Sequence, residues 1–456
     1  MTKLAPLTHQ KHSLKVLAKE PEIFDMSDAG TGKTPVHIWD FAQRRRKGSG
    51  KALVLCPKSL IRSAWGNDFK KFAPDIKVSM AYADNRQEAF DEDADIYVTN
   101  IDAAEWLAKK PKGFFHDFEI LIIDESTSVK HHTSKRSRSV AKLRKYFPVV
   151  RLLSGTPTSN GITDLWHQMF IVDGGKLLGR SFYRFRDACC IPEQVGNNAN
   201  AIRWHDKPGI ELTVGALIAK KVVRHKFEDC VDIPPNHRFA IEYDLSNKHR
   251  KMYDELERDS MLIVKGKTVR AVNGAVLYGK LLQCASGATY ADPDSDDPTD
   301  YALIDVGRYE LINDLIEARK HSVVFFSWRH QRDQLIRLAE KSGFSYALID
   351  GTVTKKGARE KIVEDYQAGK YKVLFAHPQS AGHGLTLTRG TTTIFASPTP
   401  NLEHLLQAYK RIYRISQTEK TETIMVIAKD TIDEYVWSQC QTKDIRQIDL
   451  LSYLEK

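Results

Sequence analysis

Cysteine is scarce in this 456-residue chain, and its six cysteines are scattered along it. None of them forms a C-x-x-C pair, and no C-x-x-C group is followed by histidines at the spacing of a zinc finger. The sequence therefore argues against a zinc site. Few and scattered thiols are typical of proteins from a reducing cytoplasm.

Long hydrophobic runs are missing as well. The N-terminal residues include lysines but no apolar core of signal-peptide length, and no run approaches the roughly 20 residues of a membrane span. Hydrophobic residues make up 42% of the chain and charged residues 28%, as in ordinary globular proteins. We expect a cytoplasmic protein without a membrane partner, associated with the nucleoid or, if virally encoded, in the host cytoplasm.

Acidic residues are outnumbered by basic ones. Asp and Glu total 58 against 68 Lys and Arg, which gives a formal net charge of +10. A cationic surplus suits a polyanionic partner, because neutralised phosphates supply most nonspecific affinity for nucleic acid. Many basic proteins bind no nucleic acid, so the charge alone does not decide the function.

Short apolar runs rich in β-branched residues alternate with polar helical stretches in two parts of the chain. The runs are too short for helices, so they predict buried parallel strands in doubly wound α/β sheets. The first series is 23–26, 52–56, 96–99, 120–123 and 149–153; the second is 323–326, 346–349, 373–376, 393–396 and 424–427. The helices expected between them include 35–46, 331–341, 355–367 and 402–413.

Residues 165–300 break this rhythm with Gly-Gly, Asn-Asn and Pro-Pro pairs and an acidic turn. We expect mainly helical insertions there, the crossover between the two sheets and a solvated loop at 292–300. The expected domains are a first lobe at 1–170, a helical crossover at 171–235, and a second lobe at 236–456 that includes a helical insertion to about 300.

A glycine turn follows the first apolar run and precedes a helical stretch, which is the order that a phosphate-binding loop needs. It reads Asp28-Ala29-Gly30-Thr31-Gly32-Lys33-Thr34. The glycines let backbone N–H groups point at a polyphosphate, Lys33 can reach the β- and γ-phosphates, and Thr34 can ligate Mg²⁺. Ser27 stands where the strict pattern has glycine. The alternative is a glycine-rich turn with a solvated lysine.

Two acidic residues, Asp124 and Glu125, end the run at 120–123. Ligands of parallel sheets gather at the carboxyl ends of strands, where the glycine turn should also lie. There Asp124 can hold Mg²⁺ and Glu125 can orient or activate an attacking water. The alternative is a pair of acids that opens a helix.

In combination these motifs resemble the Snf2-type branch of superfamily 2 nucleic-acid motors, in which two RecA-like lobes close on ATP. The match continues with a motif Ia at 53–60, a motif II at 124–130 and a motif III at 153–160. The resemblance implies that Gln10 contacts adenine and that Asp28, Gly30, Thr31 and Gly32 contact ATP. It also implies that Ser154, Gly155 and Thr156 couple the ATP state to lobe movement.

The second series carries the remaining motifs of this branch. Residues 325–328 resemble motif IV, 350–352 with Arg359 the next block, 380–388 motif V and 407–417 motif VI. The resemblance adds Gly384 and Gln407 to the ATP site. It assigns Arg411 and Arg414 as catalytic arginines that neutralise charge on the γ-phosphate. Gln407, Arg411 and Arg414 recur at four and three residues, so one helix face can present them; the alternative is a solvated basic face.

Nucleic-acid contacts are also implied by motif position. Small polar side chains stand where relatives touch the phosphate backbone. A basic tract from Lys130 to Lys145 could add phosphate contacts or be a solvated face. The predicted contacts are Thr99, Lys130, Ser159, Asn160, Ser327, Trp328 and Thr386.

The resemblance implies a single-chain, ATP- and Mg²⁺-dependent DNA helicase or translocase. Its expected substrate is duplex, forked or branched DNA, with roles in fork remodelling and branch migration during replication, recombination or repair. A DNA-binding scaffold or a motor subunit that needs partners is one alternative. An RNA helicase is another, disfavoured by the form of motif VI.

Overall fold

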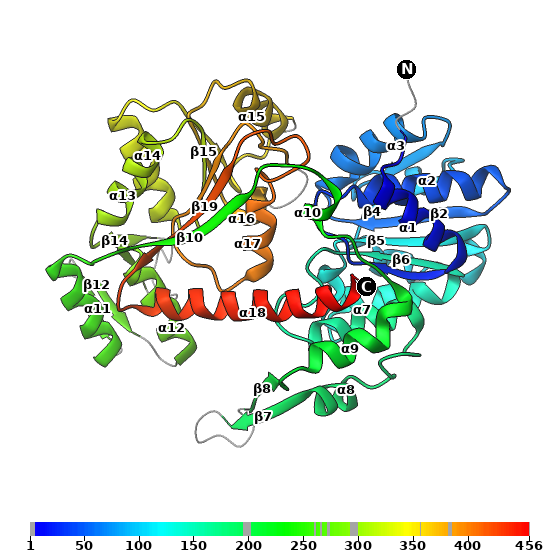
Figure 1. The fold of residues 1–456 in the computed structure, drawn as a ribbon, viewed down its shortest axis with the longest axis horizontal. Coiled ribbons are helices and arrows are strands. Elements are labelled where there is room, and N and C mark those ends of the chain that lie inside the picture. The colour runs from blue at the N-terminus through cyan, green and yellow to red at the C-terminus, as the bar shows by residue number, and fades with distance from the viewer. Residues whose placement is uncertain are drawn as a thin grey trace. The chain divides into compact units, whose positions relative to one another are not determined.

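The chain forms two compact units in a computed structural model (Figure 1). The structure describes residues 5–194, 202–259, 261–264, 267–270, 274–291, 300–355, 357–381 and 385–455. Unit 1 comprises Met1–Asp232 together with Lys443–Lys456, and unit 2 comprises Ile233–Thr442. Unit 1 thus includes almost all of the expected crossover, and it takes in a segment from the far end of the chain.

Unit 1 is built on a seven-stranded sheet in the order β3-β4-β2-β5-β6-β1-β9, and every neighbouring pair is parallel. All five strands predicted from the first series of apolar runs are confirmed. The edge strands β3 and β9 were not predicted, because β3 is not a continuous apolar run and contains Ser79, and β9 is only two residues long. The strands are β1 Glu22–Asp25, β2 Lys51–Cys56, β3 Val78–Ala81, β4 Ile96–Asn100, β5 Phe118–Asp124, β6 Val149–Leu153 and β9 Val222–Val223.

Helices cover both faces of this sheet. β2 sends Leu53 and Leu55 into one hydrophobic cluster and Val54 and Cys56 into another. This alternation explains why its sequence is a continuous apolar run, since both faces are dry. The α-helices are α1 Thr8–Lys19, α2 Lys33–Arg46, α3 Asn67–Phe72, α4 Arg86–Asp91, α5 Ala103–Leu107, α6 Lys135–Leu143, α7 Thr163–Asp173, α8 Phe182–Cys189, α9 Ile210–Ile218 and α10 Phe227–Cys230.

Unit 2 has a six-stranded parallel sheet in the order β10-β19-β18-β15-β17-β16. The five predicted strands are confirmed, and β10 adds an edge that the polar sequence Asn236–Tyr243 did not signal. The strands are β10 Asn236–Tyr243, β15 Ser322–Phe325, β16 Tyr346–Ile349, β17 Val373–Ala376, β18 Thr392–Phe395 and β19 Thr421–Ala428. The helices are α11 Asn247–Asp259, α12 Gly274–Ala285, α13 Gly307–Glu317, α14 Arg329–Lys341, α15 Ala358–Gln367, α16 Pro378–Ala381 and α17 Leu402–Tyr409. Two parallel-sheet α/β lobes were therefore predicted correctly.

The stretch between the two series is less helical than expected. Besides helices it holds three antiparallel hairpins. The expected loop at 292–300 lies outside the described residues except for Asp300. The hairpins pair β7 Cys190–Gln194 with β8 Ile202–Asp206, β11 Met261–Val264 with β12 Lys267–Arg270, and β13 Ala288–Tyr290 with β14 Tyr301–Leu303.

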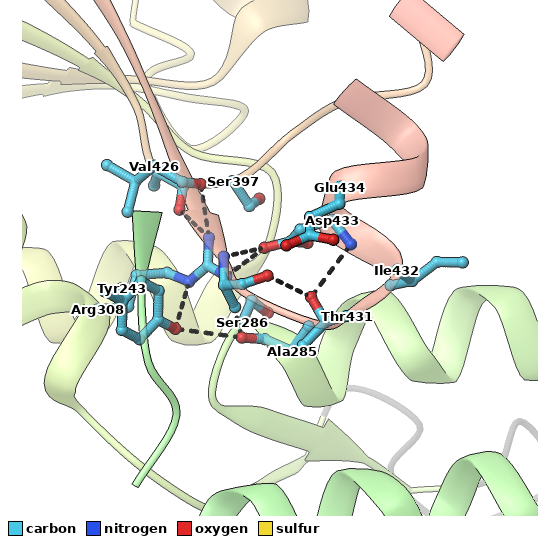
Figure 2. A network of polar contacts seen from close by, with 12 residues as sticks. Tyr243, Ala285, Ser286, Arg308, Ser397, Val426, Thr431, Ile432, Asp433 and Glu434 are labelled. Carbon is cyan, nitrogen blue, oxygen red and sulfur yellow. Dashed lines mark hydrogen bonds and ion pairs between the residues drawn. The ribbon is translucent and has the colours of Figure 1, made fainter. Parts of the chain in front are cut away.

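The last helix, α18 (Ile432–Leu454), begins in unit 2 and ends in unit 1. Its first turn is held by a buried polar network, shown in Figure 2, in which Arg308 of α13 forms an ion pair with Asp433. The guanidinium also donates to the carbonyls of Ala285, Ala396 and Val426 at 2.8–3.0 Å. Burial alone would lower the pKa of Arg308, but the carboxylate of Asp433 raises it above the ordinary value.

At its other end α18 belongs to the core of unit 1. Leu450 and Leu451 join the same hydrophobic cluster as Val214 and Ile218 of α9. Among the described residues, no helix combines the length and the apolar character that crossing a membrane requires.

Candidate ATP and nucleic-acid site

The glycine turn connects β1 to α2 and has the backbone of a phosphate-binding loop. Gly30 and Gly32 have φ values of +96° and +81°, in the left-handed region that favours glycine. A Cβ on Gly32 would lie 2.4 Å from Nε2 of Gln10, and one on Gly30 would lie 2.8 Å from the ring of Phe227. Both glycines are therefore required by conformation and by space.

Lys33 begins α2 and folds back over this loop. Its Nζ donates to the carbonyl oxygens of Ser27 at 2.6 Å and Asp28 at 3.1 Å. Thr34 follows it in the first turn of α2, where the positive end of the helix dipole favours an anion. A bound polyphosphate would replace these carbonyl oxygens as the partner of the ammonium group.

Gln10 lies against the loop from α1. Its Nε2 donates to the carbonyl of Thr31 at 3.2 Å, and its Oε1 accepts from the backbone N–H of Leu7 at 2.9 Å. The neighbouring His9 ring also lies 2.8 Å from the carbonyl of Thr31. The structure thus places Gln10 beside the phosphate loop; its contact with adenine stays a prediction.

Asp124, the last residue of β5, is buried at the same edge of the sheet. The indole Nε1 of Trp65 donates to Oδ2 at 2.9 Å, and the backbone N–H of Glu125 donates to Oδ1 at 3.0 Å. Burial raises the pKa of Asp124, and the Trp65 hydrogen bond and the charge of Lys33 partly oppose that rise. Asp124 and Asp25, which precedes the glycine turn, are both in register with Leu153 of β6, so Asp124 and the turn lie at the same edge of the sheet.

The donor set suits magnesium. A threonine hydroxyl and an aspartate carboxylate, Thr34 and Asp124, are hard oxygen ligands, and Mg²⁺ typically takes one or two such protein ligands with phosphates and waters. Glu125 follows with φ +52°, a left-handed backbone that is uncommon outside glycine and asparagine. The backbone thus turns out of β5 directly after Asp124.

The predicted coupling residues lie directly against the phosphate loop. The N–H of Ser154 donates to the carbonyl of Asp25 at 3.1 Å, and the Ser154 hydroxyl accepts from the N–H of Thr156 at 3.1 Å. A Cβ on Gly155 would lie 3.2 Å from the backbone nitrogen of Ala29. A movement of the phosphate loop would therefore displace residues 154–156 directly.

Asp25 is a site residue that the sequence analysis missed. Its carboxylate lies 3.2 Å from Nε2 of His37 and accepts from the N–H of Ser27 at 3.0 Å. Burial would raise the pKa of Asp25, but the His37 hydrogen bond and the charges of His37 and Lys33 lower it to about 2. The sequence did contain a signal for Asp25, which is a carboxylate inside the apolar run 23–26.

A second missed element is the segment Val222–Cys230, which follows β6 by about seventy residues in sequence and lies beside the loop. Arg224 forms an ion pair with Asp28, and the hydroxyl of Ser27 accepts from the N–H of His225 at 3.1 Å. Ser27, the departure from the strict loop pattern, therefore has a structural partner. No motif marked this segment in the sequence.

The predicted arginines of unit 2 are not presented by one helix face, so that expectation is wrong. α17 ends at Tyr409, because the chain turns and the carbonyl of Arg411 accepts from the N–H of Leu387 at 2.9 Å. Arg411 is nearly buried and donates to the carbonyl of Gln407 at 2.8 Å. Arg414 donates to Leu385 and to the hydroxyl of Thr386 at 2.9 and 3.0 Å. Gly384 lies outside the described residues.

Three predicted DNA contacts cluster around one carboxylate. Lys130 lies 3.1 Å from Asp164 and donates to the hydroxyl of Ser159 at 3.0 Å, while the N–H of Asn160 donates to Asp164 at 3.0 Å. The Lys130 side chain is only 9% exposed. Its charge therefore has a carboxylate partner within unit 1.

Other predicted contacts differ in accessibility. Thr99 is fully buried and its hydroxyl donates to the carbonyl of Ala81 at 2.8 Å, so its placement does not fit a contact with DNA. Ser327 and Trp328 are partly exposed, and the Gln331 side chain accepts from both of their N–H groups at 2.7 and 3.2 Å. On α6, Lys135, Arg138 and Lys142 are exposed at helical spacing.

Comparison with known proteins fits this arrangement. Residues 9–285 match the SNF2-related domain, and residues 307–416 match the helicase conserved C-terminal domain. Protein p41 of Acyrthosiphon pisum secondary endosymbiont phage 1 is 27% identical over 94% of both chains. The mouse chromodomain-helicase-DNA-binding protein 1-like is 22% identical over 91% of this chain, which spans 46% of that relative.

A solved structure supports the fold. The Mycobacterium smegmatis helicase Lhr, bound to ssDNA and AMP-PNP, aligns with 96% of this chain and 48% of its own at a TM-score of 0.56 and 15% identity. The chain thus spans less than half of Lhr and of the mouse relative, but nearly all of the phage protein. Because the SNF2-related match covers most of unit 1 and extends into unit 2, this chain belongs to the SNF2-related family.

Proposed function

We propose that this protein is an ATP-dependent DNA helicase or translocase that acts as a single chain on duplex, forked or branched DNA in the cytoplasm. The observation that carries the proposal is that the glycine turn after β1 and Asp124 at the end of β5 lie at the same edge of one sheet, because Asp25 and Asp124 are both in register with Leu153 of β6. A phosphate loop that faces a metal-binding carboxylate is the arrangement that nucleoside triphosphate hydrolysis needs.

Each residue of the proposed site has a separate task. Lys33 and the N–H groups of the loop bind the β- and γ-phosphates, and Glu125 orients the attacking water. Mg²⁺, held through Asp124 and Thr34, would neutralise charge on the phosphates. Arg411 and Arg414 stabilise the negative charge that develops on the γ-phosphate. Thr156 and its neighbours transmit loop movement, since Gly155 contacts the loop.

Fork remodelling and branch migration are our proposal for the biological role. The phage relative of nearly the same length favours a minimal motor, because the chain aligns with 94% of it. The mouse relative, by contrast, is more than twice as long as the region it shares with this chain. An RNA helicase and a nonhydrolysing scaffold remain the alternatives that an experiment must separate.

The test is ATP hydrolysis by purified protein with single-stranded DNA, duplex, fork, Holliday junction and RNA. We expect stimulation by DNA, strongest with forks or junctions. Equal rates with and without every nucleic acid would remove the motor function, and stimulation by RNA alone would remove the DNA assignment. Glu125→Gln should keep ATP and DNA binding while abolishing turnover, which excludes a contaminating ATPase.

A further inference from the structure

The segment Val222–Cys230 forms one wall of the phosphate loop. β9 pairs with β1 in parallel register, and the N–H of Met26 then donates to the carbonyl of Val223 at 2.8 Å. The N–H of Asp28 continues this ladder by donating to the carbonyl of His225 at 3.0 Å. The backbone of the loop is therefore hydrogen-bonded to this segment at two successive points.

Arg224 binds the loop through its side chain as well. Its Nη1 donates to Oδ1 of Asp28 at 2.6 Å and to the carbonyl of Met26 at 3.0 Å. The second carboxylate oxygen of Asp28 accepts from the N–H of Phe227 at 3.0 Å. The Arg224 side chain is only 5% exposed, so this ion pair is screened little by solvent.

A carboxylate in a phosphate loop needs a cation beside it. Unpaired, the charge of Asp28 would repel a triphosphate bound to the same backbone, and the repulsion would be strong in a partly desolvated site. Arg224 neutralises this charge and fixes the direction of the carboxylate. The two residues therefore decide both the electrostatic potential and the shape of the loop at its N-terminal end.

Arg224 also lies where the connections between the two units reach unit 1. The chain leaves unit 1 at Asp232, eight residues after Arg224, and returns in α18 from Lys443 onward. Glu455, just beyond α18, has its Oε1 3.4 Å from Nε of Arg224. One guanidinium therefore contacts the phosphate loop, belongs to the outgoing segment and pairs with the returning one.

The returning segment is fixed near this point by apolar packing. Tyr453 lies against Gly215 of α9, where a Cβ would be 3.0 Å from its ring, and Leu450 packs there too. Arg446 lies 3.7 Å from the largely buried carboxylate of Asp206. A displacement of Arg224 would therefore change its contact with Glu455, at the end of a segment that is packed against α9.

We propose that Arg224 is a positioning residue for ATP, which holds Asp28 and thereby couples nucleotide binding to the two segments that connect unit 1 with unit 2. This inference rests on the proposed ATPase function. By thermodynamic reciprocity, anything that shifts those segments must change nucleotide affinity, and nucleotide must shift them equally.

The first experiment separates positioning from mere stability. Arg224→Ala should raise KM for ATP, and the Kd for a fluorescent ADP analogue, by roughly tenfold, within the usual range for coupled sites. Arg224→Lys should keep part of the affinity. The double variant Arg224→Ala/Asp28→Asn should recover most of it, because the uncompensated carboxylate is then absent. A purely structural arginine would give no such recovery.

The second experiment tests the coupling to the returning segment. Glu455→Gln should raise the Kd for the fluorescent ADP analogue severalfold, because it removes the partner that the returning segment offers to Arg224. Asp449→Asn is the matched control and should leave this Kd unchanged, because Asp449 is exposed on α18, six residues before Glu455. If both variants bind the analogue equally, the coupling is overturned.

The outcomes also distinguish this inference from the proposed function. If the wild-type protein hydrolyses ATP and Arg224→Ala keeps the wild-type KM and analogue Kd, the positioning role is overturned while the ATPase function stands. If Arg224→Ala weakens binding but Asp28→Asn restores none of it, the charge argument is overturned. If the wild-type protein shows no hydrolysis with any nucleic acid, the proposed function fails, and analogue binding still decides the role of Arg224.

Discussion

The indole nitrogen of Trp65 donates a hydrogen bond to the Asp124 carboxylate across 2.9 Å, and it does so from a π-helical turn far from β5 in sequence. The bond favours the charged form of a carboxyl group whose pKa burial raises. Trp65 thus supports the form of Asp124 that can hold a cation.

This hydrogen bond should be visible in the pH dependence of hydrolysis. Below its raised pKa Asp124 is protonated and loses Mg²⁺, so kcat/KM should fall as the pH falls through that value. Trp65→Phe removes the donor and raises the pKa further, so the acid limb should move to higher pH. The measurement is kcat/KM against pH at limiting Mg²⁺. Phe69→Leu, which alters the adjacent packing without a hydrogen bond, should leave the limb in place.

The buried pair Asp25–His37 should contribute to stability at neutral pH. Because the pKa of Asp25 falls from 3.8 to about 2, the folded state gains about 2 kcal/mol above pH 4 and loses it as the pH falls towards 2. Asp25→Asn should therefore lower the free energy of unfolding at pH 7, with a difference that shrinks below pH 4. Urea unfolding across this range measures it.

An exposed carboxylate provides the comparison for that experiment. Asp93 is 85% exposed and lies 3.6 Å from Lys51 and Lys77, so Asp93→Asn should change stability by only a few tenths of a kcal/mol. Equal losses for the two variants would contradict a special role for the Asp25–His37 pair.

The Arg308–Asp433 pair should be the most sensitive polar contact of unit 2. Asp433→Ala leaves a buried guanidinium without its carboxylate and should cost about 3–5 kcal/mol. The apolar double variant Arg308→Met/Asp433→Leu should recover much of that loss, because no buried charge remains. Urea unfolding, with hydrogen exchange at the start of α18, measures both. A loss below 1 kcal/mol for Asp433→Ala would show that the network is not needed.

Buried and exposed basic side chains should differ in their effect on DNA binding. Lys130→Gln breaks a largely buried ion pair with Asp164 and should lower stability more than it changes the salt dependence of DNA affinity. Replacing the exposed Lys135, Arg138 and Lys142 by Gln should instead reduce the slope of log affinity against log salt by about 0.9 for each lost phosphate contact. An unchanged slope of log affinity against log salt would show that the exposed face of α6 does not contact phosphates.

The sheets could be predicted because buried parallel strands must be continuously apolar. β2 and β5 are buried on both faces, so each appears in the sequence as a continuous apolar run. β10 could not be recognised, because it is an edge strand with polar side chains such as His237, Arg238 and Glu242, and pairing with β19 along its whole length fixes it. The hairpin of β7 and β8 could not be recognised for the same reason, because most of its side chains are exposed.

The site could be predicted where function restricts the local sequence. Lys33 and Asp124 stand next to glycines or strand ends, whose spacing is visible in one dimension. Arg224 and Trp65 act from other elements, and only the fold brings them to Asp28 and Asp124. The prediction that a helix presents Arg411 was wrong, because the carbonyl of Arg411 accepts a hydrogen bond from the N–H of Leu387 instead of continuing the helix.

The division of unit 1 between the two ends of the chain has a consequence for biosynthesis. Residues 1–232 leave the ribosome long before 443–456, yet Leu450 and Leu451 belong to their core. Until then Val214 and Ile218 lack part of their apolar cover, and exposed apolar surface invites aggregation during translation. The nascent first lobe should therefore depend on chaperones until residues 443–456 have been synthesised.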